Sequence, residues 1–167
     1  MSAYVVRDMR PDERDRVVEL TRAAYAEFEE VMSDATWKGF SGAMDSVLDD
    51  SGDGQIIVVD DGYRIVGSVF YFGAGTRAYG DDPLLAAPEF RLLAVDPHGR
   101  GRGVGRALVE ECIRRAKASG SRELGLHTSK SFASAVAMYQ QMGFARVPER
   151  DFHPPGGEVV EGYRLGL

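Results

Sequence analysis

The segment from Glu89 to Ser119 constrains the fold more than any other part of this 167-residue chain. It opens with the strand-like run EFRLLAVD, passes through the glycine- and arginine-rich run HGRGRGVGR, and continues as a helix-like pattern. In that pattern the apolar residues on one face recur at helical spacing, as Val104, Leu108, Cys112 and Ala116. A strand that leads through a glycine loop into an amphipathic helix is typical of an α/β fold, in which helices cover a sheet.

The glycine loop has the chemistry of an anion-binding site. A helix N-terminus leaves backbone N–H groups without partners and carries partial positive charge, so it can bind phosphate. Gly101, Gly103 and Gly105 allow close approach of the backbone, and Arg100 and Arg102 add charge. The spacing does not match the dinucleotide pattern G-x-G-x-x-G, and the Gly-Lys pair of the nucleotide-triphosphate loop is missing. The alternative is a glycine-rich turn that binds no ligand.

Charge is distributed unevenly along a chain whose net charge is -6. Residues 100–122 include seven basic and two acidic residues, a local charge of +5, whereas residues 27–53 carry a local charge of -7. A basic segment in an acidic protein indicates an anionic ligand that is held locally. It argues against nucleic acid as a partner, which usually needs a broader basic surface. We expect Arg114, Arg115 and Lys117 to face solvent.

The remaining sequence alternates between strand and helix patterns without repeats, which predicts a single domain over residues 1–167. The strand patterns cover 3–10, two segments around an Asp61-Gly62 turn within 54–73, 89–96, 122–128, 144–152 and 159–167. The helix patterns cover 11–28, 36–48, 103–119 and 131–142, and residues 73–88 are predicted to form a loop.

The strand at 89–96 has an irregular alternation. Phe90 and Leu92 would share one face, and Leu93 and Val95 would take the other. A β-bulge produces such a change of phase. A strand that is buried on both faces is the competing interpretation.

Several classes of site and location are disfavoured by composition. Cys112 is the only cysteine, so an internal disulfide or a cysteine-based zinc site is excluded, and we expect Cys112 to lie in the core. The three histidines are far apart in the sequence, and we expect no metal. The sequence has no apolar run of membrane-spanning length and no secretion signal at its start. We therefore expect a cytoplasmic protein with no membrane partner.

Three segments carry a resemblance to a known family. RGRGVG at 100–105 resembles the R/Q-x-x-G-x-G/A signature of the GCN5-related N-acetyltransferase (GNAT) family. EFRLLAVDP at 89–97 and MYQQMGF at 138–144 are similar to two further family segments, in the usual order. The resemblance implies an α/β fold with a mixed, mostly antiparallel central sheet, flanked by helices, whose central strands are splayed.

The resemblance also implies an enzyme that uses acetyl-CoA as co-substrate and acetylates a primary amine by direct attack. Carried over by position, backbone N–H groups of the glycine loop hold the pyrophosphate, and the backbone of Leu93 and Val95 pairs with the pantetheine arm. The N–H of Leu93 or Ala94 is the candidate donor to the thioester oxygen. The cofactor-binding candidates are Leu93, Ala94, Val95, Arg100, Gly101, Arg102, Gly103, Val104, Gly105, Arg106 and Ser134.

Two residues are candidates for proton transfer. Glu89 matches the acid that serves as general base in several relatives, and Tyr139 matches a tyrosine that often protonates the departing thiolate. The structural alternatives are a surface carboxylate paired with Arg91 and a core aromatic on an amphipathic helix. His127, or a chain of water molecules, is another candidate base, although a structural histidine is the simpler interpretation.

One position departs from the family pattern. Many relatives have an asparagine seven residues before the tyrosine, where this chain has Phe132. This substitution removes one polar contact to the cofactor, which Ser131 or Ser134 could replace. We expect Phe132 to pack in the core.

The acceptor is predicted from charge. The acidic region that contains Glu27, Glu29, Glu30 and Asp34 belongs to the part of the chain that walls the acceptor pocket in relatives. This predicts a cationic acceptor, such as a polyamine-like or aminoglycoside-like amine or a peptide terminus. The alternatives are a non-catalytic acyl-CoA sensor and a phosphate-binding, kinase-like protein. Relatives are often dimers, so a homodimer is compatible with the sequence.

Overall fold

The computed structural model describes residues 3–78 and 82–167. Seven strands form one sheet in the order β1-β2-β3-β4-β5-β7-β6. The strands are β1 (Val5–Asp8), β2 (Gln55–Asp60), β3 (Ile65–Phe72), β4 (Glu89–Val95), β5 (Glu123–Thr128), β6 (Ala145–Arg146) and β7 (Glu161–Gly166). The α-helices are α1 (Arg14–Tyr25), α2 (Asp34–Asp49), α3 (Val104–Ala118) and α4 (Ala133–Gln141). Among the described strands, β4 and β5 are the one pair that runs in parallel, so the expected mixed, mostly antiparallel sheet is confirmed.

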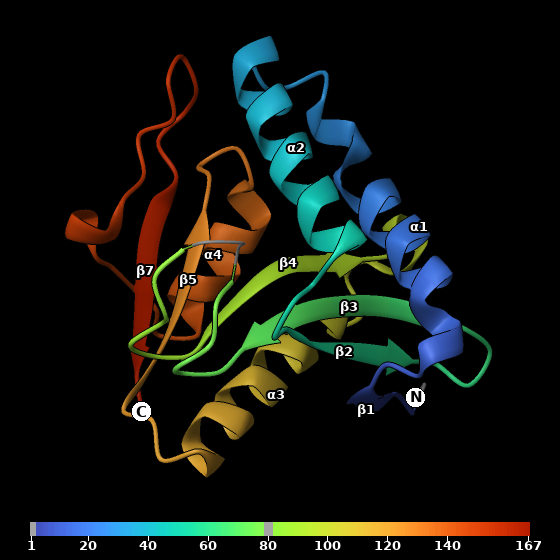
Figure 1. Cartoon of the computed structure of the whole chain (residues 1–167). Coiled ribbons are helices and arrows are strands. Elements are labelled where there is room, and N and C mark those ends of the chain that lie inside the picture. Colours follow the sequence, from blue (N-terminus) through green and yellow to red (C-terminus); the bar gives the residue numbers. More distant parts are fainter. Residues whose placement is uncertain (1–2, 79–81) are drawn as a thin grey trace.

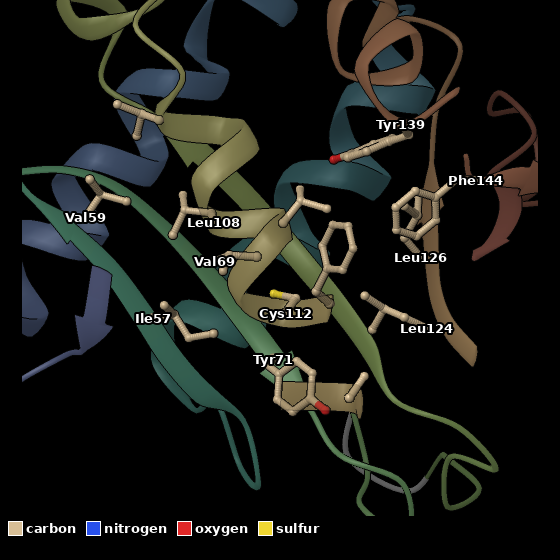
Figure 2. Packing of buried hydrophobic residues seen from close by; sticks show 14 of the residues in the cluster. Ile57, Val59, Val69, Tyr71, Leu108, Cys112, Leu124, Leu126, Tyr139 and Phe144 are labelled. Carbon is tan, nitrogen blue, oxygen red and sulfur yellow. The ribbon is translucent and has the colours of Figure 1, made fainter. Parts of the chain in front are cut away.

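The helices cover both faces of the sheet, as Figure 1 shows. α1 and α2 lie on one face, where Leu20 and Val47 belong to a buried cluster with Val58 and Phe70. α3 and α4 lie on the other face. The buried cluster on that face includes Ile57, Val69, Leu108, Cys112 and Tyr139 (Figure 2). The expectation that Cys112 is a core residue is confirmed, because its exposure is 0%. None of the described helices is long and apolar enough to cross a bilayer.

Some element boundaries differ from the sequence prediction. The helix predicted for residues 11–28 is divided into a 3-10 turn at Pro11–Glu13, α1, and a second 3-10 turn at Ala26–Phe28. The strand predicted for 144–152 shrinks to β6, because Pro148 begins a 3-10 turn that ends the pairing with β7. Part of the loop predicted at 73–88 lies outside the described residues.

The irregular alternation of β4 arises from a β-bulge. The register with β3 shifts between the pairs Ser68–Ala94 and Phe70–Arg91. Leu92 at the shift has a φ of 51°, the left-handed region that non-glycine residues rarely adopt. The bulge prediction is confirmed, but the predicted face assignment is wrong. Phe90, Leu93 and Val95 all pack in the cluster that contains α3, and Leu92 packs on the opposite face.

A side chain from α1 holds the bulge. The Tyr25 hydroxyl donates a 2.6 Å hydrogen bond to the Leu93 carbonyl oxygen. Leu93 has no registered partner in β3, so this contact fixes a part of β4 that the strand ladder does not. α1 and the distorted strand are thereby joined directly.

The central strands diverge. β4 and β5 are in register only at Glu89–Gly125 and Phe90–Leu126. Beyond these pairs the described ladder between them ends, although β4 continues to Val95 and β5 to Thr128 (Figure 1). The splay that the resemblance implied is therefore present, and it opens the sheet at the carboxyl ends of both strands.

The packing of α3 against β3 depends on Gly67. A Cβ atom at this position would lie 2.5 Å from Val104 Cγ1 and 3.1 Å from Leu108 Cδ1. The contact with Val104 is shorter than real Cβ atoms show, and the contact with Leu108 is tighter than most, so a side chain at Gly67 would force these side chains at the start of α3 to shift. The position of the α3 N-terminus therefore depends on the absence of a side chain there.

We expect Gly67→Ala to lower the free energy of unfolding by about 1–3 kcal/mol, because it overpacks a close helix–sheet contact. Urea unfolding followed by circular dichroism measures this change. Gly42→Ala in α2 is the control, since no atom lies within 4 Å of its added Cβ. Alanine within a helix should stabilise it by about 0.5–1 kcal/mol. Equal stability of the two variants would contradict the packing argument.

We expect Tyr25→Phe to lower the free energy of unfolding by about 1 kcal/mol, because it removes one part-buried hydrogen bond and keeps the ring. The matched control is Tyr63→Phe, whose side chain is 97% exposed. Denaturant unfolding of both variants should separate them. A Tyr25→Phe variant as stable as the control would mean that this hydroxyl does not support the bulge.

Candidate functional site

A cleft of about 970 Å³ occupies the opening between the diverging strands. β4 contributes Leu93 and Val95 to its wall, and β5 contributes Leu126 and His127. The remaining walls come from α1, α2, the loop before α3, the start of α4, and the segment that precedes β7. The cleft therefore brings together regions that are distant in the sequence, at the point where the sheet loses its pairing.

The loop that follows β4 is tied to α1 at both ends. At its start, Asp96 accepts hydrogen bonds from the His98 N–H (2.9 Å) and from Arg16 Nη2 (2.8 Å). Burial alone raises the pKa of Asp96, but these bonds outweigh burial and hold it below its ordinary value. Further on, the Arg100 guanidinium binds Glu27 (2.6 Å) and the Ala24 carbonyl (2.9 Å). The loop is therefore fixed in position relative to α1.

Directly after the second anchor, Arg100, the backbone presents donors that have no hydrogen-bond partner within the described residues. Gly101 and Gly103 have φ values of 76° and 79°, and Gly103 is the N-cap of α3 without a side-chain cap. Within residues 3–78 and 82–167, these backbone N–H groups donate no hydrogen bond: Gly101, Gly103, Val104, Gly105 and Arg106. No atom lies within 4 Å of a Cβ built at Gly101 or Gly103, so the space above the loop is open.

Tyr139 lies where the core meets the cleft. Its exposure is only 5%, and its ring packs edge-on against Phe90 and Phe144. Burial raises the pKa of Tyr139 well above its ordinary value, and the nearby Tyr25 and Cys112 add to the rise. Figure 2 shows the Tyr139 hydroxyl pointing away from Phe144. The phenol is thus a proton donor that stays protonated at neutral pH.

Glu89 lies behind the cleft wall and is not among the residues that line it. Arg91 Nη2 donates to its carboxylate at 3.1 Å, and His127 Nδ1 lies 3.5 Å away. Burial alone raises the pKa of Glu89, but the neighbouring His127 and Arg91 outweigh burial and lower it. The ion pair with Arg91 that we considered as an alternative is therefore present.

His127 does line the cleft. Its Nε2 lies 2.9 Å from the Arg150 carbonyl oxygen, which can only accept, so Nε2 carries a proton. The buried Nδ1 makes no hydrogen bond within the described residues, and the ring lies 4.6 Å from that of Phe152. His127 is held on both sides and stands between Glu89 and the cleft.

A group of aromatic side chains forms another part of the cleft wall. Phe132 contacts the rings of Tyr25, Phe28 and Phe40 at centroid distances of 4.6–5.4 Å. The expectation that Phe132 packs in the core is wrong, since it belongs to neither core cluster and lines the cleft instead. Ser134 is exposed in the first turn of α4 and also lines the cleft.

Most of the acidic residues that we expected to wall the acceptor pocket lie outside the cleft. Glu27 lines the cleft but is paired with Arg100, and Glu29, Glu30 and Asp34 are exposed and do not line it. A carboxylate that the sequence analysis missed, Glu158, lies in the wall instead. No sequence pattern pointed to Glu158, because a lone acidic residue in a loop belongs to no periodic pattern.

Most of the predicted cofactor residues lie on the cleft. Among the candidates, Ala94 and Arg102 do not line it, whereas the following do: Leu93, Val95, Arg100, Gly101, Gly103, Val104, Gly105, Arg106 and Ser134. Within the described residues, no group of three His, Cys, Asp or Glu side chains could hold a metal ion.

Several known proteins with a similar sequence or structure are acetyltransferases. A human N-acetyltransferase 8B is 37% identical over 75 residues, which are 44% of this chain and 33% of that protein. The chain spans about a fifth to a third of the length of the curated relatives that it matches. A Corynebacterium glutamicum structure described as histone acetyltransferase HPA2 and related acetyltransferase superposes with a TM-score of 0.69 at 20% identity, over 98% of this chain and 96% of that one.

A second solved structure carries a ligand. It is a GNAT family acetyltransferase from Brucella melitensis in complex with acetyl-CoA, with a TM-score of 0.63 at 14% identity, over 100% of this chain and 90% of that one. The sequence profile of the acetyltransferase (GNAT) family matches residues 15–144 of this chain. The match covers most of the chain, and the chain belongs to the GNAT acetyltransferase family.

Proposed function

We propose that the chain is one N-acetyltransferase domain that uses acetyl-CoA to acetylate a primary amine of a cationic small molecule or peptide. The observation that carries this proposal is the open N-terminus of α3 at the edge of a cleft between two diverging strands. A cleft of this volume is large enough to hold a cofactor arm and a small acceptor.

The loop before α3 fits the diphosphate of the cofactor. Its unsatisfied N–H groups and the positive end of the helix dipole are suited to an anion, and the open space above Gly101 and Gly103 leaves room for one. The acetyl-CoA complex of the Brucella neighbour supports this assignment. Because the Arg100 side chain is bound to Glu27, the backbone is the better candidate to hold the phosphates. We assign this role to residues 100–106.

The bulged part of β4 is the candidate site for the pantetheine arm. When bound, acetyl-CoA supplies an acetyl thioester, whose carbonyl carbon bonds to the amine nitrogen as its C–S bond breaks. Leu93 and Val95 line the cleft and would pair with the arm through their backbone. Leu93 has no registered partner in β3, which supports its N–H, rather than that of Ala94, as the donor to the thioester oxygen.

Two protons must move during transfer. Tyr139, which stays protonated because its pKa is raised, is the proposed donor to the departing sulfur. Glu89 is the proposed final acceptor of the amine proton. Because Glu89 does not line the cleft and His127 Nε2 is already protonated and bound to the Arg150 carbonyl, the proton reaches Glu89 through a water molecule.

We expect acetyl-CoA to bind the purified chain in calorimetry, and Gly103→Ala to weaken that binding about tenfold, a loss of about 1.4 kcal/mol. Alanine at a φ of 79° is strained, and its methyl group projects into the phosphate space. Gly120→Ala is the matched control, with a φ of 80° at the other end of α3 and equally open surroundings. Binding of ATP but not of acetyl-CoA would favour the kinase-like alternative instead.

We expect Tyr139→Phe to lower kcat about a hundredfold while leaving acetyl-CoA affinity unchanged, since it removes only a general acid. Release of the CoA thiol, followed with a panel of amines, measures turnover, and Tyr63→Phe is the control. Acetyl-CoA binding without turnover on any amine, in wild type and variant alike, would identify a non-catalytic acyl-CoA sensor. Unchanged turnover in Tyr139→Phe would remove the tyrosine from the mechanism.

A further inference from the structure

Glu158 is built into the wall of the cleft that faces α2. Its backbone N–H donates to Thr36 Oγ1 at 2.9 Å, which ties the segment before β7 to the first turn of α2. A Cβ at Gly157 would lie 3.6 Å from the same Thr36 oxygen, so the two segments are in close contact. Glu158 is therefore held where two distant parts of the chain close one side of the cleft.

Neutral hydroxyl groups hold the Glu158 carboxylate. Ser131 Oγ donates to both of its oxygens at 2.8 Å, and the hydroxyl of Ser129, which is itself 7% exposed, donates to Oε2. The Ser129 bond is the largest cause of the lowered pKa of Glu158, and Ser131 and Lys130 lower it further against the opposing effect of burial. The carboxylate is thus fixed in orientation and remains ionised at neutral pH.

This arrangement differs from that of many other carboxylates in the structure. Partly buried acids elsewhere are paired with arginine, among them Glu13, Asp60, Glu89, Asp96, Glu111, Glu123, Asp151 and Glu161. Within the described residues, no basic side chain lies within the 4.0 Å ion-pair distance of Glu158, and the attraction of Lys130 acts from further away. Glu27, the other described carboxylate on the cleft, is already paired with Arg100.

Hydroxyl groups orient this anion in the cleft wall, but within the described residues it has no ion-pair partner. Such an anion is suited to a cationic ligand. We propose that Glu158 binds a positive charge of the acceptor other than the reacting amine, so that the preferred acceptors carry two cationic groups. The reacting nitrogen must lose its proton to attack, whereas an adjacent carboxylate favours the protonated form. A fixed, ionised Glu158 therefore suits the second group. This inference rests on the proposed use of the cleft for an amine acceptor.

The cleft also has room for the segment that joins the two charges. Phe28, Phe40 and Phe132 form an apolar wall beside Glu158 in the same cleft. Hydrocarbon can be buried against these rings, while the Glu158 carboxylate meets a charge. The chemical class that fits is a diamine or a similar dication with an apolar spacer.

The test compares two amines of equal length, 1,5-diaminopentane and pentylamine, in calorimetric titrations of the whole chain, with and without CoA. Wild type should bind the diamine about tenfold more tightly, which corresponds to one charge-assisted contact. Glu158→Gln keeps the shape and one of the two oxygens that accept hydrogen bonds from the serines. It removes the charge, so it should abolish this preference while leaving pentylamine affinity unchanged. Added salt should weaken diamine binding in wild type more than in the variant.

Glu149→Gln is the matched control, because Glu149 is exposed and does not line the cleft; it should behave as wild type. Ser131→Ala leaves the charge but loosens its orientation and should reduce the preference in part. Equal affinity of wild type for both amines, or equal loss in Glu158→Gln and Glu149→Gln, would overturn the inference. Failure to bind acetyl-CoA would instead refute the proposed function. The two outcomes are distinguishable, because the titrations without CoA measure the contribution of Glu158 to amine binding independently of the cofactor.

Discussion

The site depends on the early end of pairing between β4 and β5. Two parallel strands that share only two registered positions expose backbone and side chains that a complete sheet would bury. The chain stabilises this opening from several sides: Tyr25 holds the bulge, Asp96 and Arg100 tie the following loop to α1, and Gly67 lets α3 pack closely beneath. The position of the opening is therefore set by contacts in the surrounding elements.

The local charge differs between three regions of the cleft. At the α3 end, backbone donors and a helix dipole offer positive potential, while the side chains of Arg100 and Arg106 are paired with carboxylates. In the middle, Arg91 and His127 line the cleft and compensate the charge of Glu89, which lies behind them. At the α2 end, a carboxylate stands among hydroxyls and aromatic rings. A ligand that is anionic at one end and a ligand that is cationic at the other could approach each other in this field.

Local sequence patterns predicted the elements well where they are governed by local physics. α3, its glycine N-cap and the strand before it followed from periodicity and from glycine conformation. Features set by tertiary contacts were not predictable. The face assignment in β4 failed because the left-handed Leu92 moves the bulge by one residue. Glu158 was missed because its serine partners lie 27 and 29 residues away in the sequence. The acidic stretch gave a wrong prediction of the pocket wall in part because Glu27 is paired with Arg100, which lies 73 residues away.

The Tyr25 hydroxyl has a consequence for communication across the molecule. A carbonyl oxygen has two lone pairs, so Leu93 can keep its bond to Tyr25 and still accept another donor from a molecule lying along β4. The Tyr25 ring meanwhile makes tilted or edge-on contacts with Phe28, Phe40 and Phe132. A single phenol thus joins the aromatic wall directly to β4, so a shift of that wall by an occupant would change the environment of the Leu93 oxygen.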